Sequence, residues 1–341
     1  MHVVLPGDID DPATPSGGNH YDRRVCRGLA DAGWRVHEHP APGDWPTPGP
    51  AARADLAALL AALPGGALVL LDGLVASVAP EALQPQADRL RTVVLVHLPR
   101  DDAAEARALA AATAVVTTSE WTRRRLLDRY GLPADRVHVA APGVDPAPPA
   151  SGTPAGTALL CVAALAPHKG HDVLLAALAA VADRSWRCAC VGTLARDPAY
   201  VERLRRQAAG SGLTGRVELL GPRTGNALAA AYAAADLLVL ASRGETYGMV
   251  VTEALARGIP VLATDAGGLP EALGRAPGGE RPGLLVPPDD PAALAGALRD
   301  WLGDAGLRER LRRAARARRS TLADWSTTTT IVAAVLKGAA A

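Results

Sequence analysis

The chain has 341 residues, of which 49% are hydrophobic and 21% charged, and its formal net charge is +1. That length is too great for one ordinary hydrophobic core and suits two domains of roughly 150 residues each. Because the net charge is close to zero, no overall field attracts polyanions, and we expect no nucleic-acid partner.

No transmembrane segment is predicted. The most apolar stretch, residues 56–78, is interrupted by a Pro-Gly-Gly turn and by Asp72, whereas a spanning helix needs about 20 apolar residues. The first residues are acidic and do not resemble a secretory signal, so we expect a cytoplasmic protein. The arginine-rich residues 307–320 leave peripheral association with a membrane open, although Leu307 and Leu311 indicate the apolar stripe of a surface helix.

In the first half, short apolar runs alternate with longer alanine-rich stretches, which is typical of parallel α/β domains. A helix predicted in front of Gly33 would use that glycine as its C-cap. The predicted strands of this half begin at His2, Trp34, Ala67, Thr92, Thr113 and Arg136.

A segment rich in Pro, Gly and Ala, residues 142–157, interrupts the alternation and is predicted to be an interdomain linker. We place an N-terminal domain at residues 1–148, a C-terminal domain at 149–320, and a helix at 321–341 that packs back on the first domain. Ligands of doubly wound sheets bind beyond the carboxyl ends of the strands, so the loops that follow strands are candidate sites. The later strands are predicted to begin at Ala158, Arg187, Arg216, Ala235, Ile259 and Gly283.

One of these loops, "SRGETYG" at residues 242–248, leads into a predicted helix; Glu245 lies in the loop and Glu253 lies within the helix. Backbone N–H groups at a helix start bind anions, so the amides of residues 247–250 are candidate phosphate donors. Ionised carboxylates only accept hydrogen bonds, which assigns Glu245 and Glu253 to hydroxyl groups of a sugar and a ribose. The alternative is that Glu253 is a solvated helix residue and that Glu245 complements the helix dipole.

The segment resembles the Glu-x7-Glu signature of retaining glycosyltransferases with the GT-B fold, in particular glycosyltransferase family 4, also called glycosyl transferases group 1. The resemblance extends over residues 258–273 and 283–298 and covers most of the second half. It implies two Rossmann-like, doubly wound parallel-sheet domains that face each other across a cleft, with the donor on the second domain and the acceptor on the first.

The same resemblance implies roles for individual residues. Lys169, the one interior lysine of a chain with only two lysines, matches the family's ligand for the donor diphosphate. His97 matches a histidine near the C6 hydroxyl of the sugar, and Glu245 completes the catalytic set. One departure is Ala164, which stands where the family usually has a second arginine for the diphosphate. The residues implied to bind the donor are Gly17, Gly18, Thr193, Gly221, Thr246, Tyr247, Gly248, Met249, Val250 and Glu253.

The implied reaction is transfer of a hexosyl group, with retention, from a UDP or GDP type of sugar nucleotide to a hydroxyl of a small molecule or glycolipid. The family's front-face mechanism needs no metal and no cofactor, so neither is expected here. The four cysteines lack CxxC spacing and are predicted to fill the core. Three alternatives stay open: a sugar-nucleotide epimerase, a phosphorylase of the same fold, and a catalytically silent sugar-nucleotide binder.

Overall fold

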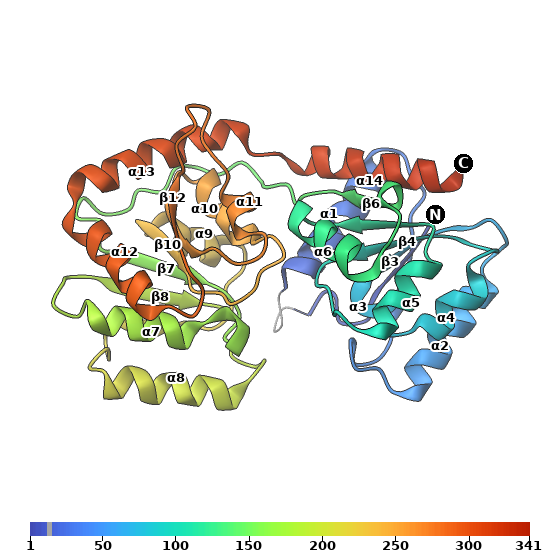
Figure 1. Ribbon diagram of the computed structural model, residues 1–341, viewed down its shortest axis with the longest axis horizontal. Helices are drawn as coiled ribbons and strands as arrows, with labels where there is room; N and C mark the ends of the chain where they lie inside the picture. Colours follow the sequence, from blue (N-terminus) through green and yellow to red (C-terminus); the bar gives the residue numbers. More distant parts are fainter. Residues whose placement is uncertain (12–15) are drawn as a thin grey trace. The chain divides into compact units, whose positions relative to one another are not determined.

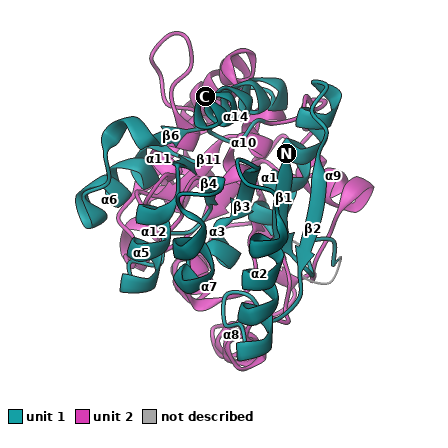
Figure 2. Cartoon of the chain, turned by 90° about the vertical axis from the view of Figure 1, so that its right-hand side faces the viewer, with its two compact units in different colours: residues 1–11, 16–143, 323–341 teal, residues 12–15, 144–322 magenta. Residues whose placement is uncertain are grey.

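The computed structural model describes residues 1–11 and 16–341 and divides the chain into two compact units (Figures 1 and 2). Unit 1 comprises residues 1–11, 16–143 and 323–341, and the described part of unit 2 comprises residues 144–322. Thr14, which precedes the predicted donor residues Gly17 and Gly18 closely in the chain, lies outside the described residues. Each unit contains one six-stranded sheet.

The sheet of unit 1 is parallel throughout and has the order β2-β1-β3-β4-β5-β6. The strand order reverses direction at β1 and β3, which makes the carboxyl ends of these strands the expected ligand position. Its strands are β1 (His2–Pro6), β2 (His37–Ala41), β3 (Leu68–Asp72), β4 (Arg91–Val96), β5 (Ala114–Thr117) and β6 (Val137–Val139). Its helices are α1 (Gly17–Asp31), α2 (Pro50–Ala62), α3 (Gly73–Ala76), α4 (Pro80–Leu83), α5 (Ala103–Ala111), α6 (Glu120–Tyr130) and α14 (Trp325–Ala340).

The sheet of unit 2 is also parallel and has the order β12-β11-β10-β7-β8-β9. Its order reverses at the neighbours β7 and β10. Its strands are β7 (Ala158–Val162), β8 (Arg187–Val191), β9 (Val217–Leu219), β10 (Leu237–Leu240), β11 (Val261–Thr264) and β12 (Gly283–Val286). Its helices are α7 (His171–Ala180), α8 (Pro198–Gly210), α9 (Gly225–Ala233), α10 (Met249–Ala256), α11 (Leu269–Leu273), α12 (Pro291–Gly303) and α13 (Ala305–Arg318).

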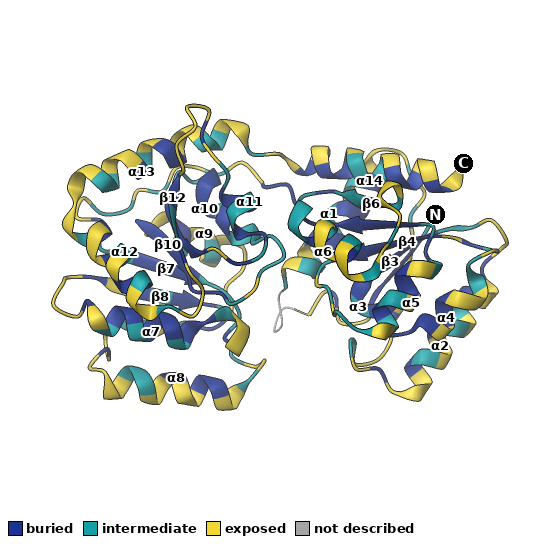
Figure 3. Cartoon of the chain, viewed as in Figure 1, coloured by how far each residue is buried: buried dark blue, intermediate teal, exposed yellow. Residues whose placement is uncertain are grey.

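Strands β5, β10 and β11 are buried along their whole length, as Figure 3 shows for β10. Helices cover both faces of such sheets, which explains why these strands read as continuous apolar runs rather than as alternating patterns. The thiols of all four cysteines are free and buried, in keeping with the prediction that they fill the core. Over the described parts of the chain, no helix has the length and apolar character needed to cross a bilayer.

Every predicted strand overlaps a strand of the structure, but the second begins later than the sequence indicates. The predicted start is Trp34, whereas β2 begins at His37. The amide of Trp34 donates instead to the carbonyl of Leu29 at 3.0 Å, because the chain is still closing the end of α1 through Gly33, whose φ is +87°.

Helix α14 packs on α1 within unit 1. A Cβ at Gly28 of α1 would lie only 2.2 Å from Oγ1 of Thr329, so the missing side chain permits the close approach of the two helices. The segment predicted to be a linker is bound to unit 2 at its far end, since Asp236 accepts hydrogen bonds from the amide and hydroxyl of Thr153 at 2.7 and 2.6 Å.

Candidate functional site

The loops that follow β7 and β10 are pressed together at the switch point of unit 2. The loop after β7 ends at Gly170, which has a φ of +65° and starts α7. A Cβ on this glycine would lie 1.9 Å from the carbonyl oxygen of Ala241, immediately after β10. This contact, available only to glycine, brings Lys169 beside the loop that carries Glu245.

Lys169 and Glu245 form an ion pair with 2.7 Å between Nζ and Oε1. The hydroxyl of Ser242 donates to the same oxygen at 3.0 Å, and the carbonyl of Ser242 accepts from Thr264 of β11 at 2.5 Å. The two charged side chains keep 20% and 13% of their surface exposed. The pair is therefore anchored to the sheet and still open to a ligand.

The loop around Glu245 rests on the paired glycines that follow β11. A Cβ on Gly267 would lie 1.8 Å from the carbonyl oxygen of Glu245, and one on Gly268 would lie 2.2 Å from that of Thr246. The amide of Gly268 also donates to the Glu245 carbonyl at 2.8 Å. Any side chain at these positions would displace the loop.

Helix α10 begins at Met249, and Gly248 before it has a φ of +95°. Within residues 1–11 and 16–341, no side chain caps this helix start. The first backbone amides of an uncapped helix remain available to an anion, and the helix dipole favours a negative charge there. The predicted donor residues from Thr246 to Val250 thus surround a helix start that lies next to Lys169 and Glu245.

Glu253 is half-buried and its Oε2 accepts a hydrogen bond from the hydroxyl of Tyr232 on α9, at 2.8 Å. The guanidinium of Arg257 lies 4.5 Å from the centre of the Tyr232 ring. Burial raises the pKa of Tyr232 well above its ordinary value, so the hydroxyl stays a donor. This contact weighs against Glu253 as a freely solvated residue. The sequence gives no sign of Tyr232 beyond an aromatic residue in an alanine-rich helix.

Thr193 and Gly221 follow β8 and β9 and reach the same edge of the sheet as the loop after β7. The carbonyl of Thr193 accepts from the amide of Leu165 at 3.0 Å, and the carbonyl of Gly221 accepts from the amide of Gly192 at 3.0 Å. A Cβ on Gly192 would lie 1.9 Å from the carbonyl oxygen of Ala163. The loops after three neighbouring strands are therefore joined by backbone contacts.

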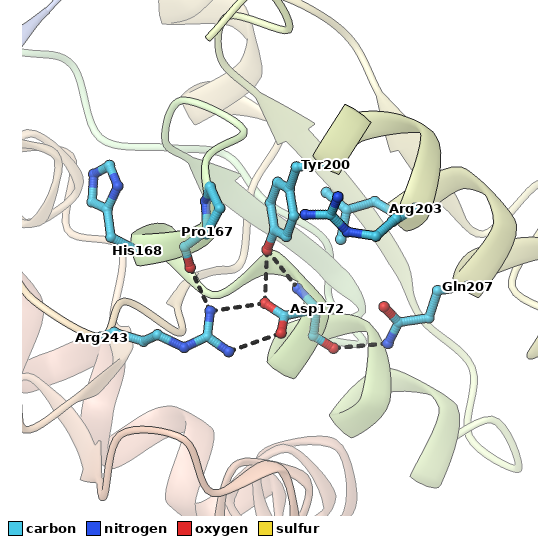
Figure 4. A pocket seen from close by; sticks show the side chains of 8 residues that line it. Pro167, His168, Asp172, Tyr200, Arg203, Gln207 and Arg243 are labelled. Atoms are coloured by element: carbon cyan, nitrogen blue, oxygen red, sulfur yellow. Dashed lines mark hydrogen bonds and ion pairs between the residues drawn. The ribbon is translucent and has the colours of Figure 1, made fainter. Parts of the chain in front are cut away.

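A hollow of about 650 Å³ lies between the start of α7 and the helix α8 (Figure 4). Arg243 bridges its floor by hydrogen bonds to both carboxylate oxygens of Asp172, at 3.0 and 2.8 Å, and to Asp289 at 2.6 Å. Burial by itself would raise the pKa of Asp172, but the hydrogen bonds from Arg243 and Tyr200 outweigh it and lower the pKa to about 2. Arg243 thus holds this loop in place with its charge already paired.

In unit 1, His97 follows β4 and lies against the start of α1. Its Nε2 is 2.7 Å from Oδ1 of Asp22, and the ring of Tyr21 meets its edge at 5.2 Å between centroids. A Cβ on Gly18 would lie 3.3 Å from the His97 ring, so the glycine leaves room for the imidazole. Gly17 is the first residue of α1, which Ser16 caps through the amide of Asn19 at 3.1 Å.

Two acids of this cluster, Asp22 and Asp72, carried no signal in the sequence. Asp72 ends the apolar run of β3, and Asp22 lies on the buried face of α1. Burial raises the pKa of Asp22 to about 7, although a hydrogen bond with Asp72 and the charge of Arg23 oppose the change. Burial and the charge of Asp22 raise the pKa of Asp72 well above its ordinary value, and burial lowers that of His97.

Two family models match the chain. The model described as glycosyl transferases group 1 matches residues 153–318, and the model described as glycosyltransferase family 4 matches residues 89–148. The chain belongs to the family 4 glycosyltransferases. The family resemblance read from the motifs is therefore confirmed.

The curated relatives of this chain include proteins named D-inositol 3-phosphate glycosyltransferase. The one from Salinispora tropica is 36% identical over 235 residues, which are 62% of this chain and 48% of the relative. The one from Streptomyces avermitilis is 35% identical over 254 residues, which are 69% of this chain and 54% of the relative. The chain spans about half the length of the curated relatives it matches.

Solved structures with the same fold cover nearly the whole chain. The sucrose-phosphate synthase of Thermosynechococcus elongatus has a TM-score of 0.79 at 23% identity and covers 99% of this chain and 98% of its own. HepE of Anabaena, solved in complex with UDP-glucose, has a TM-score of 0.76 at 20% identity and covers 99% and 100%. These similarities and the two parallel sheets confirm the predicted α/β fold of the GT-B class.

Proposed function

We propose that this chain is a retaining glycosyltransferase that moves a hexosyl group from a nucleoside diphosphate sugar to an acceptor hydroxyl. The observation that carries the proposal is the Lys169–Glu245 pair at the switch point of unit 2, 2.7 Å apart and beside the uncapped start of α10. A fixed cation next to free amides suits a diphosphate, and a fixed carboxylate suits sugar hydroxyls. The UDP-glucose bound by the neighbour HepE supports this class of donor.

Each group has a defined part in donor binding under this proposal. Lys169 and the amides from Tyr247 to Val250 take the charge of the diphosphate. Glu245 accepts hydrogen bonds from hydroxyls of the transferred sugar. Glu253 accepts from the ribose with the oxygen that Tyr232 leaves unused, and the loops of Thr193 and Gly221 hold the base.

The proposed chemistry needs positive charge at the departing diphosphate and does not need a protein nucleophile. As the bond to the anomeric carbon breaks, negative charge grows on the phosphate oxygens, and Lys169 with the helix-start amides stabilises it. The leaving phosphate takes the proton of the acceptor hydroxyl, which enters on the same face, so the configuration is retained. We propose that no metal takes part, because Lys169 supplies the charge.

The acceptor is proposed to be a small molecule or a glycolipid bound by the domain of residues 1–148, with His97 as a polar group offered to a substrate hydroxyl. The curated relatives are named for D-inositol 3-phosphate, so an inositol phosphate is the first acceptor to test. A cytoplasmic location, with peripheral contact with a membrane left open, belongs to the same proposal.

A second candidate function is a silent sugar-nucleotide binder, and Ala164 favours it. The loss of the family's arginine removes one of two cationic ligands of the diphosphate, and Arg243 is occupied by Asp172 and Asp289. Such a protein would bind a UDP-sugar or GDP-sugar without consuming it. An epimerase would change the donor without any acceptor, and a phosphorylase would require pyridoxal phosphate.

The test is a transfer assay with UDP-sugars and GDP-sugars, followed by NMR of the anomeric configuration of the product. The two lysines of the chain give a matched pair: Lys169→Ala should lower transfer by about 100-fold or more, whereas Lys337→Ala, on the exposed side of α14, should leave it unchanged. Binding without turnover in the parent protein would favour the silent binder. Activity lost with EDTA and restored by manganese would contradict metal independence.

A further inference from the structure

Unit 1 buries two carboxyl groups side by side next to His97. Asp22 and Asp72 are each 2% exposed, and they come from α1 and from the end of β3. The surrounding side chains are apolar or carry a thiol: Val3, Leu5, Val25, Cys26, Leu70 and Leu95. Two ionised carboxylates in such surroundings repel each other and lack hydration, so the cluster requires a compensating charge or proton.

The hydrogen bonds of the two acids leave one oxygen of each available for that proton. Oδ1 of Asp22 faces Nε2 of His97 at 2.7 Å, and Oδ1 of Asp72 accepts from the amide of Leu74 at 2.5 Å. The second oxygen of each acid, Oδ2 in both, is buried and has no hydrogen-bond partner among the described residues, and Oδ2 of Asp72 lies 3.9 Å from Nε2 of His97. A proton on one Oδ2 turns it into a donor to the other, so a single proton satisfies both atoms.

A metal ion is the competing way to compensate the two acids. Asp22, Asp72 and His97 each offer one atom within 4.8 Å of the others, which is close enough for a shared ion. However, the space beside the acids is too small to hold a water molecule and is lined by apolar side chains. Zinc needs a fourth ligand, and magnesium keeps several waters. Among the described residues, the Cys26 thiol does not belong to the group of atoms that lie within 4.8 Å of one another, and the space beside the acids is too small for water. A proton needs no further ligand.

We propose that Asp22 and Asp72 share one proton and together position the ring of His97, with hydrogen on Nε2 and a lone pair on Nδ1. In this arrangement the protonated Asp72 donates to Asp22, and Oδ1 of the ionised Asp22 accepts a hydrogen bond from Nε2 of His97. Nδ1, which has no partner within the described part of the chain, is left as an acceptor on a side chain that is 11% exposed. That this lone pair receives a substrate hydroxyl rests on the proposed function; the shared proton does not.

The other titratable groups near the cluster are held in one charge state. On α1, Arg23 is paired with Asp10 and Glu38, each at 2.5 Å, and its charge reaches Asp22. Tyr21 donates to the carbonyl of Ala140 at 2.8 Å, and burial raises its pKa. Burial, followed by the charge of Asp22, raises the pKa of the Cys26 thiol to about 12. β1 contributes Val3 and Leu5. α14 contributes Trp325, whose ring meets that of Tyr21 edge-on, with 5.7 Å between the ring centroids.

The shared proton is tested by infrared spectroscopy of the folded protein without donor or acceptor. At neutral pH the parent protein should show the carbonyl stretch of a protonated carboxyl group. Asp72→Asn should remove this band, because its amide oxygen still accepts from Leu74 and its NH2 donates to Asp22 with no titrating proton. Asp55→Asn, an exposed position on α2, is the matched control and should keep the band.

The ring of His97 is followed in the same samples by NMR of protein labelled with ¹⁵N-histidine, with His97→Gln to assign its signals. The parent protein and Asp72→Asn should both show hydrogen on Nε2, and Asp22→Leu should lose this preference. A folded Asp72→Asn protein with an unchanged carboxyl band would overturn the proposal. So would elemental analysis that finds one bound metal in the parent protein and none in Asp22→Asn.

A second variant keeps the test decisive if Asp72→Asn does not fold. Asp22→Asn also leaves one carboxyl facing an amide that can donate to it, so the band should disappear there as well, and its persistence would refute the shared proton. Neither measurement needs turnover. A protein that shows the band but transfers no sugar would contradict the proposed function and leave the acid pair established.

Discussion

The ammonium of Lys169 lies 2.7 Å from Oε1 of Glu245, and 76 residues of chain separate the two. Each group compensates the charge of the other, and both side chains are partly withdrawn from water. A ligand with an anionic and a hydroxyl-bearing part can therefore be received without first burying an unpaired charge. Substitution of either residue of this pair is therefore a direct test of the proposed donor site.

Replacing Glu245 by glutamine should separate its role in transfer from its role in stability. Glu245→Gln keeps the size of the side chain but removes the charge opposite Lys169. We expect transfer to fall by about 100-fold, with a change in the free energy of unfolding below about 1 kcal/mol because the pair is partly exposed. Glu309→Gln on the exposed side of α13 is the control. Full activity in Glu245→Gln would remove this acid from the site.

Gly267→Ala should displace the loop that carries Glu245. The new Cβ would lie 1.8 Å from the Glu245 carbonyl oxygen, and φ at this position is +61°. We expect a loss of stability of about 1–3 kcal/mol and a loss of transfer. Gly279→Ala shares a positive φ, of +85°, but its Cβ would meet no described atom within 4 Å. Thermal denaturation should therefore show the larger loss at Gly267, and equal losses would contradict the clash.

Tyr232→Phe removes the hydroxyl that donates to Glu253 at 2.8 Å. The carboxylate then loses its orientation, and we expect the KM for the donor to rise by about 5-fold to 10-fold, equivalent to roughly 1–1.4 kcal/mol, with kcat little changed. Tyr200→Phe is the matched variant, since the hydroxyl of Tyr200 donates to Oδ1 of Asp172 at 2.7 Å and not to Glu253. If both variants raise the KM equally, the contact with Glu253 has no special part in donor binding.

Asp72→Asn should make stability less dependent on pH. The pKa of Asp72 is raised in the folded protein, so above the pKa of an unfolded aspartate the folded state holds more protons than the unfolded state. Stability of the parent protein therefore falls as pH rises, by up to about 1.4 kcal/mol per pH unit for one group. The asparagine amide of the variant does not titrate. Urea denaturation at pH 5 and pH 8 should therefore show that the free energy of unfolding of the variant, relative to that of the parent protein, is higher at pH 8 than at pH 5. A constant difference would refute the raised pKa.

Local sequence was enough to predict most of the fold and part of the site. The apolar runs at β5, β10 and their neighbours are buried on both faces, so their composition alone indicates parallel strands between helices. The start of α10 after Gly248 was likewise visible, because a flexible glycine loop leads into a helical spacing. The family motifs at Lys169, Glu245 and Glu253 lie in such local stretches, and the family is confirmed.

Partners that are distant in the chain were decided only by the tertiary structure. Lys169 meets Glu245 because β7 and β10 are neighbours, and no local pattern encodes that strand order. Asp22, Asp72 and His97 meet because α1, β3 and β4 converge, whereas in the sequence Asp72 is only the polar end of an apolar run. Propensity and hydrophobic period act over a few residues, while hydrogen bonds and shared protons depend on distances that exist only once the sheets are assembled.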